Sequence, residues 1–564
     1  MIAEFPTALL LIGGAAIIPL IKGWWARKAW ALLLPLLALW HLVTLPSGSF
    51  ADFELLGHTL VLMRVDRLSL MFGYVFMIAA ALNAIYAMHH NDTVQHVAGL
   101  VYAGSALGAV FAGDLLTLFI FWELTAVSSV LLIWARRTRH SYRAGMRYVI
   151  VHLVSGMLLL GGALMYLYSG ESLAFDHFTL DKPGAWLLLI AFGIKSAFPL
   201  LHNWLQDAYP EATETGTVVL SAFTTKLGIY ALARGFAGTE LLIVVGTVMT
   251  AFPIFYAVIE NDLRRVLAYS VNNQLGFMVV GIGIGTDLAL NGAVAHAFAD
   301  ILFKALLFMS MGAVLLRTGT VKGNELGGLY KSMPWTTGFC IVGAASISAF
   351  PLFSGFVTKS MIMTSAAMEG YSLVWLVLLF ASAGVFHHAG IKIPYFAFFA
   401  HDSGIRCKEA PMNMLIAMAI AAALCIGIGV FPDLFYSVLP YQAEYHPYTA
   451  SHVLSQLQLL VFSALAFAVL MRTGIYPPEL PSVNLDFDWL YRRLGTGVAT
   501  STINLLADIG KALSEMTTHM LKRISRRIYR HHGPEGVLAR TWPTGSMVLW
   551  VAILLASYLI LYYT

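Results

Sequence analysis

Charged residues are scarce in this sequence. Asp, Glu, Lys and Arg together make up 11% of the 564 residues, whereas hydrophobic residues make up 59%. A soluble globular domain carries roughly 25% charged residues, so this composition excludes an ordinary water-soluble fold. The formal net charge is only +4. Because this small excess is predicted to lie on one side of a bilayer, nucleic-acid binding is excluded as well.

Cysteines are fewer still. The sequence contains Cys340, Cys407 and Cys425 alone, widely spaced and without a C-x-x-C or Cys/His ligand pattern. This spacing excludes a disulfide framework and an iron–sulfur site. Recognisable motifs for nicotinamide, flavin and quinone are also lacking. We therefore predict that the chain binds no cofactor, and that any electron transfer in its complex belongs to partner proteins.

Long hydrophobic runs are abundant, and each is close to the ~20 residues that an α-helix needs to cross a bilayer. They predict an all-α polytopic membrane protein with about sixteen spans. The predicted spans are near residues 8–21, 29–45, 67–88, 97–112, 115–134, 148–168, 186–206, 214–235, 241–259, 265–285, 289–316, 337–367, 372–400, 411–431, 453–471 and 545–562.

Basic residues gather in alternate loops between these spans. Cytoplasmic loops carry the excess of Lys and Arg, so this pattern places both chain ends outside and predicts a multi-pass protein of the bacterial inner membrane. The residues that set this orientation are Lys22, Arg27, Lys28, Arg136, Arg137, Arg139, Arg143, Arg264, Arg265, Lys322, Lys331, Arg406 and Lys408.

Residues 485–532 have a different pattern, because apolar residues recur there at helical spacing opposite a strongly basic side. This is typical of an amphipathic helix on the cytoplasmic membrane surface. Unbroken, it would extend ~70 Å, although Gly495, Gly497 and Gly510 are potential breaks. Two interpretations stay open: a polybasic helix that binds lipid, and a lateral brace against partner subunits. A terminal span at 545–564 follows.

Ionisable residues inside the predicted spans are costly, and each one suggests a functional site. Glu123 lies mid-span, with a hydrogen-bonded structural carboxylate as the alternative interpretation. Lys195 precedes Pro199, which should interrupt its helix and expose polar backbone. Lys226 lies in the next span. A low-dielectric interior disfavours an ammonium ion, so such lysines are suited to releasing protons when a neighbouring charge changes.

Two further groups follow along the chain. His296, Asp300 and Lys304 are spaced i, i+4 and should share one helix face, and histidine is suited to shuttling protons. An Asp300–Lys304 ion pair that only balances charge is the alternative. Lys359 follows a helix-breaking proline and glycine, and Lys392 follows two histidines. Lys392 could instead reach toward lipid headgroups.

The order of these lysines indicates an internal duplication. A broken helix with a lysine and then a second lysine occurs twice, and five spans separate the two copies. An odd number of spans inverts the second copy relative to the first, as in many transporters. The predicted divisions are 1–96, an N-terminal group of spans; 97–235 and 239–400, the two repeats; 411–471, closing spans; 485–532, the lateral helix; and 545–564, the last span.

Several motifs closely resemble the antiporter-like family shared by Mrp-type sodium/proton antiporters and the proton-pumping membrane subunits of complex I. They are FWELTAVSSVLLI, GIKSAFPLLHNWLQDAYPEATE, LSAFTTKLGIYALAR, DLRRVLAYSVNNQLGFM, HAFADILFKALLF and FPLFSGFVTKS. The resemblance implies fourteen core helices, two inverted five-helix repeats with broken helices, and a midplane row of ionisable residues.

The resemblance also implies roles for individual residues. Glu123 matches the glutamate that interacts with a neighbouring subunit, and Lys195 matches the lysine of the first broken helix. Lys226 and the row from His296 to Lys304 match the central axis, and Lys359 matches the lysine of the second broken helix. The segment around Lys226 most resembles the D-type Mrp subunit, whereas the long tail resembles the L-type subunit of complex I.

Three functions are consistent with these features. The leading hypothesis is a subunit of a multisubunit Na⁺/H⁺ antiporter, a secondary transporter rather than an enzyme, which works with other membrane subunits, protons, Na⁺ and lipid. The second is a proton-pumping subunit of a complex I-like or hydrogenase-like redox enzyme, and the third is a subunit that energises uptake of another solute. Asp300, Ser196 and Thr225 are weak candidates for oxygen ligands of Na⁺, and the sequence identifies no metal site.

Overall fold

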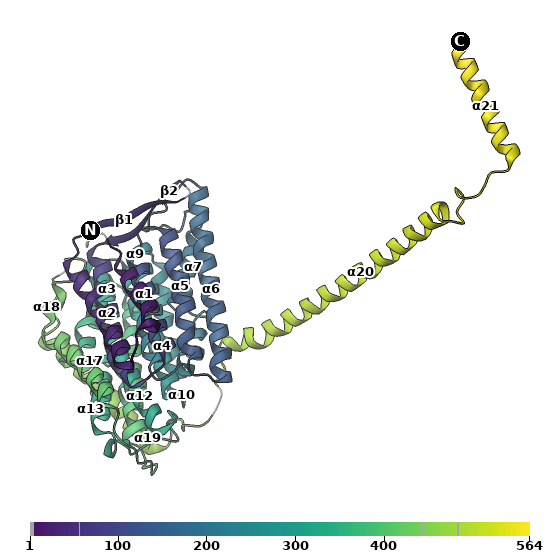
Figure 1. Ribbon diagram of the computed structural model, residues 1–564. Helices are drawn as coiled ribbons and strands as arrows, with labels where there is room; N and C mark the ends of the chain where they lie inside the picture. Colours follow the sequence, from purple (N-terminus) through teal and green to yellow (C-terminus); the bar gives the residue numbers. More distant parts are fainter. Residues whose placement is uncertain (1–4, 56, 443, 482–483) are drawn as a thin grey trace. The chain divides into compact units, whose positions relative to one another are not determined.

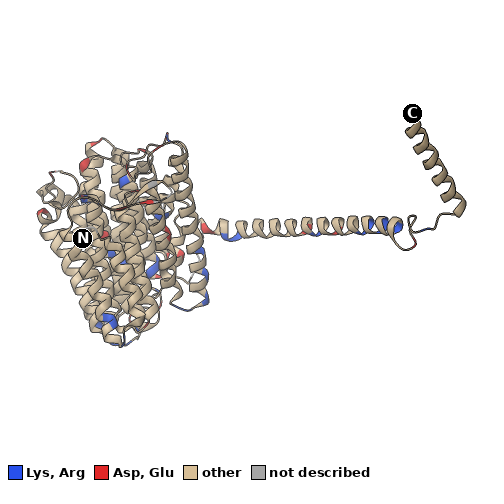
Figure 2. Cartoon of the chain, turned by 45° about the horizontal axis from the view of Figure 1, so that its top comes forward, with Lys and Arg blue, Asp and Glu red and all other residues tan. Residues whose placement is uncertain are grey.

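The computed structural model describes residues 5–55, 57–442, 444–481 and 484–564. The chain divides into two compact units, one that extends to Asn484 and one that begins at Leu485. The first unit is a bundle of long helices that run side by side (Figure 1). Lys, Arg, Asp and Glu are sparse along its helices, as the mostly tan ribbon of Figure 2 shows.

Thirteen helices in the described part of the chain are long and apolar enough to cross a membrane. They are α2 (Trp24–Thr44), α3 (Arg67–Tyr86) with η2 (Ala87–His89), α4 (Thr93–Phe111), α5 (Leu115–Trp134), α6 (Arg139–Tyr168), α9 (Gly216–Gly235), α10 (Leu241–Ile259), α11 (Leu263–Ile284), α12 (Asp287–Thr318), α15 (Ser372–Val385) continued by η5 (Phe386–Ile391), α16 (Lys392–Pro394) and η6 (Tyr395–Phe399), α17 (Met412–Val430), α19 (Ala450–Thr473) and α21 (Thr544–Tyr563).

Three shorter or broken helices account for the remaining predicted spans. They are α1 (Thr7–Ile17) with η1 (Ile18–Leu20), the pair α7 (Ala185–Lys195) and α8 (Asn203–Ala208), and the pair α13 (Pro334–Ile347) and α14 (Ser354–Met368). Short turns η3 (Tyr209–Glu211), η4 (Leu329–Lys331) and α18 (Pro432–Tyr436) lie between spans. The predicted all-α polytopic class is confirmed.

One element escaped prediction. Strands β1 (Gly48–Leu55) and β2 (His58–Val65) form an antiparallel hairpin in which Gly48 pairs with Val65. The hairpin lies across one end of the bundle (Figure 1). The backbone N–H of Gly113 donates to the Val61 carbonyl, and the Val61 N–H donates to the Asp114 carboxylate. The hairpin therefore covers the turn between α4 and α5.

The two broken helices are interrupted by related pentapeptides. Residues 196–200 read Ser-Ala-Phe-Pro-Leu directly after α7, and residues 348–352 repeat the same five letters directly after α13. Ala197 and Leu200 have positive φ angles of 58° and 70°, and Ala349 and Leu352 have 58° and 74°. Proline lacks the N–H that a continuing helix needs, and the left-handed residues turn the chain aside. The predicted helix breaks are confirmed.

A second correspondence relates the helices after α4 and α10. Asp114 begins α5 and Asp262 begins α11, and each carboxylate accepts hydrogen bonds from the backbone two and three residues later. Each also forms an isolated antiparallel bridge, to Ala174 and to Lys322 respectively. The helices α4 to α9 and α10 to α15 are therefore two five-helix repeats, related by inversion because five spans separate equivalent positions.

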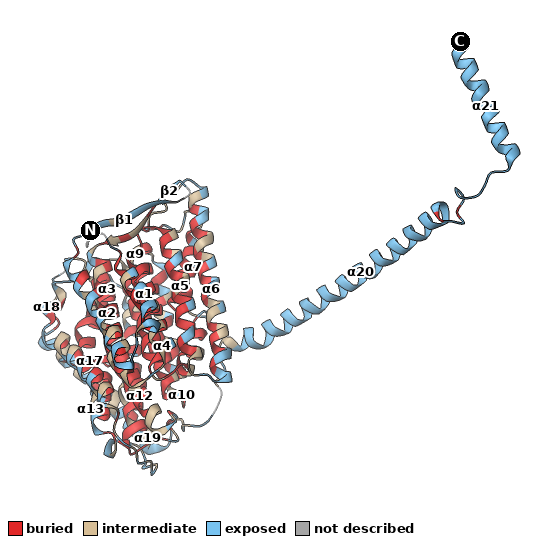
Figure 3. Ribbon diagram, in the orientation of Figure 1, coloured by how far each residue is buried: buried red, intermediate tan, exposed pale blue. Residues whose placement is uncertain are grey.

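Burial distinguishes central from peripheral helices. Helices α9, α11 and α12 are buried along almost their whole length, whereas α19 is largely exposed (Figure 3). An exposed apolar helix would be unusual in a water-soluble protein, but the outer faces of a membrane-spanning bundle contact lipid. Helices α9 and α12 carry four of the eight ionisable residues singled out above: Lys226, His296, Asp300 and Lys304.

The second unit contains η7 (Leu490–Gly495), α20 (Thr496–His532) and α21. Helix α20 is continuous over 37 residues, about 55 Å long at 1.5 Å per residue. Of the three potential breaks, Gly497 and Gly510 lie within the continuous helix, and Gly495 ends η7 directly before it. The helix is shorter than the ~70 Å that the whole segment would reach unbroken. Apolar residues recur along it at helical spacing, opposite the basic residues, as expected of a membrane-surface helix.

Candidate functional site

Lys195 is the last residue of α7 and is almost completely buried. Its Nζ donates to the Trp122 carbonyl at 3.0 Å and to Oγ1 of Thr125 at 2.6 Å, and it lies 4.0 Å from the centre of the Trp122 ring. The helix break lets this side chain leave the end of α7 and reach the middle of α5. Two neutral acceptors and an aromatic face thus contact the ammonium group.

Glu123 lies beside that acceptor pair on α5 and is half-buried. Its Oε1 is buried without a hydrogen-bond partner in the described chain. The carboxylate packs against Gly156 of α6 so closely that a Cβ at position 156 would overlap it. Ile120 and Val127, on the same helix, are half-exposed. Glu123 therefore lies at the outer edge of the row, not in its centre.

His152, a buried residue of α6, was not predicted as a site residue from the sequence. Its ring lies 4.3 Å from that of Tyr148 and 4.4 Å from that of Trp204, and neither ring nitrogen has a hydrogen-bond partner among the residues described. The available signal was the repeat itself. The 152 positions that separate Ser196 from Ser348 also separate His152 from Lys304. His152 of α6 therefore corresponds to the stretch of α12 that carries Asp300 and Lys304.

A chain of hydroxyl groups also went unpredicted. Thr224 of α9 is hydrogen-bonded to the hydroxyl of Tyr102 on α4 and, at 3.2 Å, to the hydroxyl of Tyr148 on α6. Tyr148 is in turn 2.9 Å from Oγ of Ser129 on α5. Hydroxyls both donate and accept, so this chain can pass a proton between four helices. Tyrosines in apolar runs resemble ordinary core residues, which is why they gave no signal.

Lys226 and Asp300 form an ion pair at the centre of the bundle. Nζ of Lys226 on α9 is 2.6 Å from Oδ2 of Asp300 on α12, and both side chains are 0% exposed. The Lys226 ammonium also donates to the Ser221 carbonyl at 3.1 Å. Asp300 thus pairs across to α9 and not with Lys304 on its own helix. Nζ of Lys304 has no hydrogen-bond partner in the described residues.

His296 links three helices of the second repeat. Its Nε2 is 3.1 Å from Oε1 of Gln274 on α11, and its Nδ1 is 3.0 Å from Oγ1 of Thr358 on α14. Oγ1 of Thr358 donates its own proton to the Ser354 carbonyl at 3.0 Å. Both ring nitrogens therefore face acceptors. A second proton on the ring would find a hydrogen-bond acceptor already in place.

Lys359, next to Thr358 in α14, is also buried. Its Nζ donates to the carbonyl of Ile347 at 3.1 Å and lies 4.9 Å from the centre of the Phe277 ring. Ile347 is the last residue of α13. The break leaves the Ile347 carbonyl open to this ammonium group, and the negative end of a helix favours a cation. The break itself thus creates the binding place of this lysine.

Lys392 lies apart from these groups. It is 0% exposed, so it does not reach the surface, and its Nζ donates to the carbonyls of Ala257, Val258 and Glu260 at 2.7–3.2 Å. These carbonyls lie at the end of α10. Glu479 completes the set at 2.8 Å. Burial raises the pKa of the Glu479 carboxyl, and the Lys392 ammonium only partly offsets that rise.

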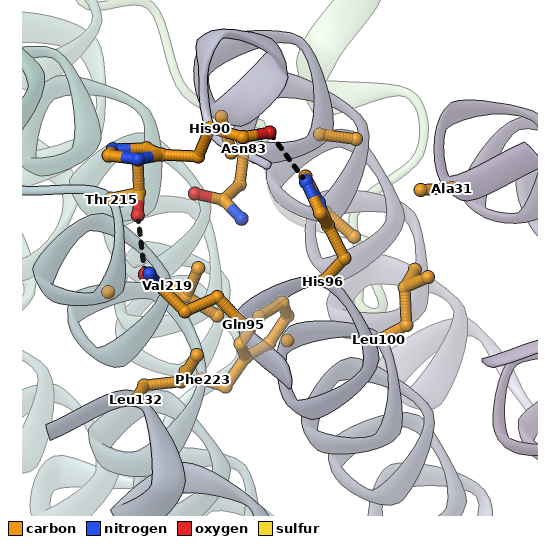
Figure 4. A pocket seen from close by; sticks show the side chains of 15 residues that line it. Ala31, Asn83, His90, Gln95, His96, Leu100, Leu132, Thr215, Val219 and Phe223 are labelled. Atoms are coloured by element: carbon orange, nitrogen blue, oxygen red, sulfur yellow. Dashed lines mark hydrogen bonds between the residues drawn. The ribbon is translucent and has the colours of Figure 1, made fainter. Parts of the chain in front are cut away.

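A small cavity of about 30 Å³ opens between α3, α4 and α9, at the bundle end that bears the basic loops. This volume is enough for a water molecule. Asn83, His90, Gln95, His96 and Thr215 supply its polar lining, and Phe223 and Leu132 close its inner side (Figure 4). The Phe223 ring packs against that of Tyr102, 5.1 Å between centres, so the closed inner end of the cavity lies next to the hydroxyl chain.

The three candidate oxygen ligands of Na⁺ have different surroundings. Asp300 is engaged by Lys226. Oγ of Ser196 is buried without a hydrogen-bond partner in the described chain, and Thr225 is buried in α9. The site of the coupling ion stays a prediction.

The fold and the buried row together define a class: a multi-pass membrane subunit with two inverted repeats and ionisable side chains along its interior. Residues 112–387 match the family described as NADH:quinone oxidoreductase/Mrp antiporter, TM. The D subunit of the Na⁺/H⁺ antiporter of Alkalihalophilus pseudofirmus is 30% identical over 356 residues, which are 59% of this chain and 72% of that protein. The chain belongs to this family.

Two further similarities concern length. The A subunit of the Na⁺/H⁺ antiporter of the same organism is 30% identical over 425 residues, 66% of this chain, but the chain spans only 52% of that protein. A chain of the membrane-bound sulfane sulfur reductase, an archaeal respiratory membrane complex, has a TM-score of 0.70 with 21% identity, and the match covers 99% of both chains. At that identity the likeness concerns the fold alone.

Proposed function

We propose that this chain is the proton-translocating subunit of a multisubunit Na⁺/H⁺ antiporter of the Mrp type in a bacterial inner membrane. Protons pass along the buried row and drive Na⁺ export together with partner membrane subunits. The relay residues are Glu123, Lys195, Lys226, His296, Asp300, Lys304, Lys359 and Lys392.

The fully buried Lys226–Asp300 pair carries the proposal. Removing two charges from water costs several kcal/mol per ion, and apolar residues of similar size would stabilise the bundle as well or better. A purely structural role therefore does not account for the pair. It joins α9 of the first repeat to α12 of the second, and a proton that neutralises Asp300 would release Lys226 from its partner.

The surrounding groups support a route to this pair from either side. On the first repeat, the cavity and the hydroxyl chain lead past His152 toward Lys195, and Glu123 lies at the outer edge where a neighbouring subunit could contact it. On the second repeat, His296 and Lys304 lie on the same helix as Asp300, and Lys359 follows at the second break. Residues 97–235 and 239–400 would each supply half of the path.

The test uses everted membrane vesicles in which Na⁺ addition releases a preformed proton gradient. Lys195→Ala and Lys359→Ala should each reduce Na⁺-dependent proton exchange by at least ~100-fold, the lower range for loss of a positioned proton-transfer group. Lys322→Ala, at a half-exposed loop position, is the matched control and should retain exchange. Equal amounts of assembled complex must be recovered from all variants. Retained exchange in the first two variants would refute the proposal.

A second candidate function is a proton-pumping subunit of a redox complex. The full-length structural match to a respiratory membrane complex favours it, because that match includes the tail beyond residue 485. Gentle extraction and purification of the chain with its partners separates the two. Copurifying flavin or iron proteins would support the redox complex, and antiporter subunits without either would support the first proposal.

A further inference from the structure

Two histidines and one glutamate meet outside the row, at the basic-loop end of the bundle. His89 ends η2, His90 follows it, and Glu214 precedes α9. One ligand atom from each residue lies within 4.8 Å of the others. Nε2 of His90 is 2.7 Å from Oε1 of Glu214, and the two imidazole rings are 4.1 Å apart. All three residues are partly buried.

The hydrogen bonds of His89 select the tautomer that a metal needs. Nδ2 of Asn413 lies 3.0 and 2.8 Å from the carbonyls of Ile85 and Tyr86 and 3.2 Å from Nδ1 of His89. The shorter contact of that Nδ1, 3.0 Å to the Tyr86 carbonyl, favours a proton on Nδ1. Nε2 of His89 keeps its lone pair and is buried without a hydrogen-bond partner in the described chain. A backbone carbonyl that holds the other ring nitrogen is typical of metal-binding histidines.

His90 lies between two hollows of the structure. It lines the inner cavity of Figure 4 and, with Asn91 to Gln95 and Arg137, a surface depression of about 500 Å³. The side chains of His90 and Glu214 are 27% and 15% exposed. An ion in solution can therefore reach His90 from the depression without crossing the bundle.

We infer that His89, His90 and Glu214 form a binding site for a divalent transition-metal ion, with Zn²⁺ as the best fit. Zn²⁺ takes imidazole nitrogen and carboxylate oxygen at about 2.0–2.2 Å, and two histidines with one glutamate leave its fourth position to water. Tetrahedral geometry at those bond lengths needs ligand atoms roughly 3.3 Å apart, so the three atoms move little on binding. Na⁺ and Ca²⁺ prefer all-oxygen sites, and the site is therefore not that of the coupling ion.

Occupancy of the site closes the mouth of the cavity. A bound ion fixes His90 between the surface depression and the inner cavity and so obstructs the way from one to the other. This second claim rests on the proposed function, because it requires that protons use the cavity. Metal binding itself does not depend on the transport activity.

Binding is measured on the purified full-length chain in detergent, by Zn²⁺ content after equilibrium dialysis and by the visible spectrum of bound Co²⁺. We expect one tightly held ion per chain. His89→Ala, His90→Ala and Glu214→Gln should each weaken binding by more than ~10-fold, since even loss of an outer-shell partner costs 10–100-fold. His531→Ala with His532→Ala removes the adjacent histidine pair of α20 and is the matched control. His96→Ala removes a cavity histidine outside the ligand set.

Glu214→Gln preserves size and a hydrogen bond to His90, so it tests the site even where an alanine variant fails to fold. Unchanged Zn²⁺ content and Co²⁺ spectrum in that variant and in His90→Ala overturn the inference, as does loss of the tight ion in the control pair alone. In vesicles, Zn²⁺ should inhibit proton movement in the wild type and at least ~10-fold less potently in His90→Ala. Tight Zn²⁺ binding without inhibition of proton movement would refute closure of the cavity mouth but would not contradict the metal site.

Discussion

The two repeats have the same arrangement of helices but carry their lysines at different positions. In the first, Lys195 precedes the break and crosses to the middle of α5. In the second, the equivalent residue is Ile347, and Lys359, beyond the break, reaches back to the Ile347 carbonyl. The break bends the chain in both repeats, but only the second lysine binds a carbonyl at the end of its own broken helix. The sequence places the lysine before the break in the first repeat and after the break in the second.

The third helices of the repeats differ in the same manner. His152 of α6 lies between aromatic rings, whereas Lys304 of α12 shares its helix with Asp300 and His296. The central ion pair joins the repeats, because Lys226 belongs to the first and Asp300 to the second. Inversion of the backbone therefore does not make the row of charges symmetric.

Breaking the pair that joins the repeats should have the largest effect. Asp300→Asn leaves the Lys226 ammonium buried and bonded to the neutral Ser221 carbonyl, and removal of one partner of a buried pair costs about 3–5 kcal/mol. Thermal unfolding of the purified chain measures this loss. Asp287→Asn, at an exposed position in the first turn of the same helix, should stay within about 0.5 kcal/mol. Similar losses in both variants would contradict this account of the pair.

A smaller effect tests the Glu123 position at the outer edge of the first repeat. Gly156→Ala places a methyl group where the Glu123 carboxylate lies. Displacement of that carboxylate should slow proton movement in vesicles by about 100-fold, with the chain still assembled. Gly161→Ala is the control on the same helix, because its added Cβ would be at an ordinary 3.5 Å from Leu187. Equal rates of proton movement in the two variants would contradict a role for Glu123 in the relay.

The smallest effect probes what the repeats share. Ala197 and Ala349 hold left-handed backbone angles, which cost an L-residue roughly 1–2 kcal/mol and cost glycine almost nothing. Ala197→Gly and Ala349→Gly should each stabilise the chain by about 1 kcal/mol, after the greater freedom of unfolded glycine is included. Ala191→Gly, within α7, should instead destabilise it by at least about 1 kcal/mol. Thermal unfolding measures all three, and unequal shifts at 197 and 349 would show that the two breaks are not equivalent.

Much of the fold was predictable because its signals are local. Hydrophobic length indicated the spans, and Pro199 and Pro351 indicated the breaks. The hairpin of β1 and β2 was missed because it lies in the connection between two predicted spans, where hydrophobic length gives no signal. Gly497 and Gly510 were potential breaks of α20, but a helix interior tolerates single glycines at about 1 kcal/mol each.

The candidate site was predictable in part. Every residue proposed from the sequence lies inside the protein or half-buried at its edge, because charge in an apolar run is conspicuous. The partner of Asp300 was not predictable, since the i, i+4 spacing suggested Lys304. His152, Tyr102 and Tyr148 were missed because a buried histidine or tyrosine in an apolar helix resembles ordinary core packing until its neighbours are known.

The sequence by itself determined that the chain spans a membrane, where its helices break, and which residues carry charge at depth. Those properties follow from hydropathy and backbone chemistry along one stretch of chain. The tertiary structure alone decided that Lys226 meets Asp300, that Lys359 binds the end of α13, and that two histidines meet Glu214. Contacts of this kind depend on how each helix is rotated against its neighbours, and that rotation is set by packing between residues far apart in the chain.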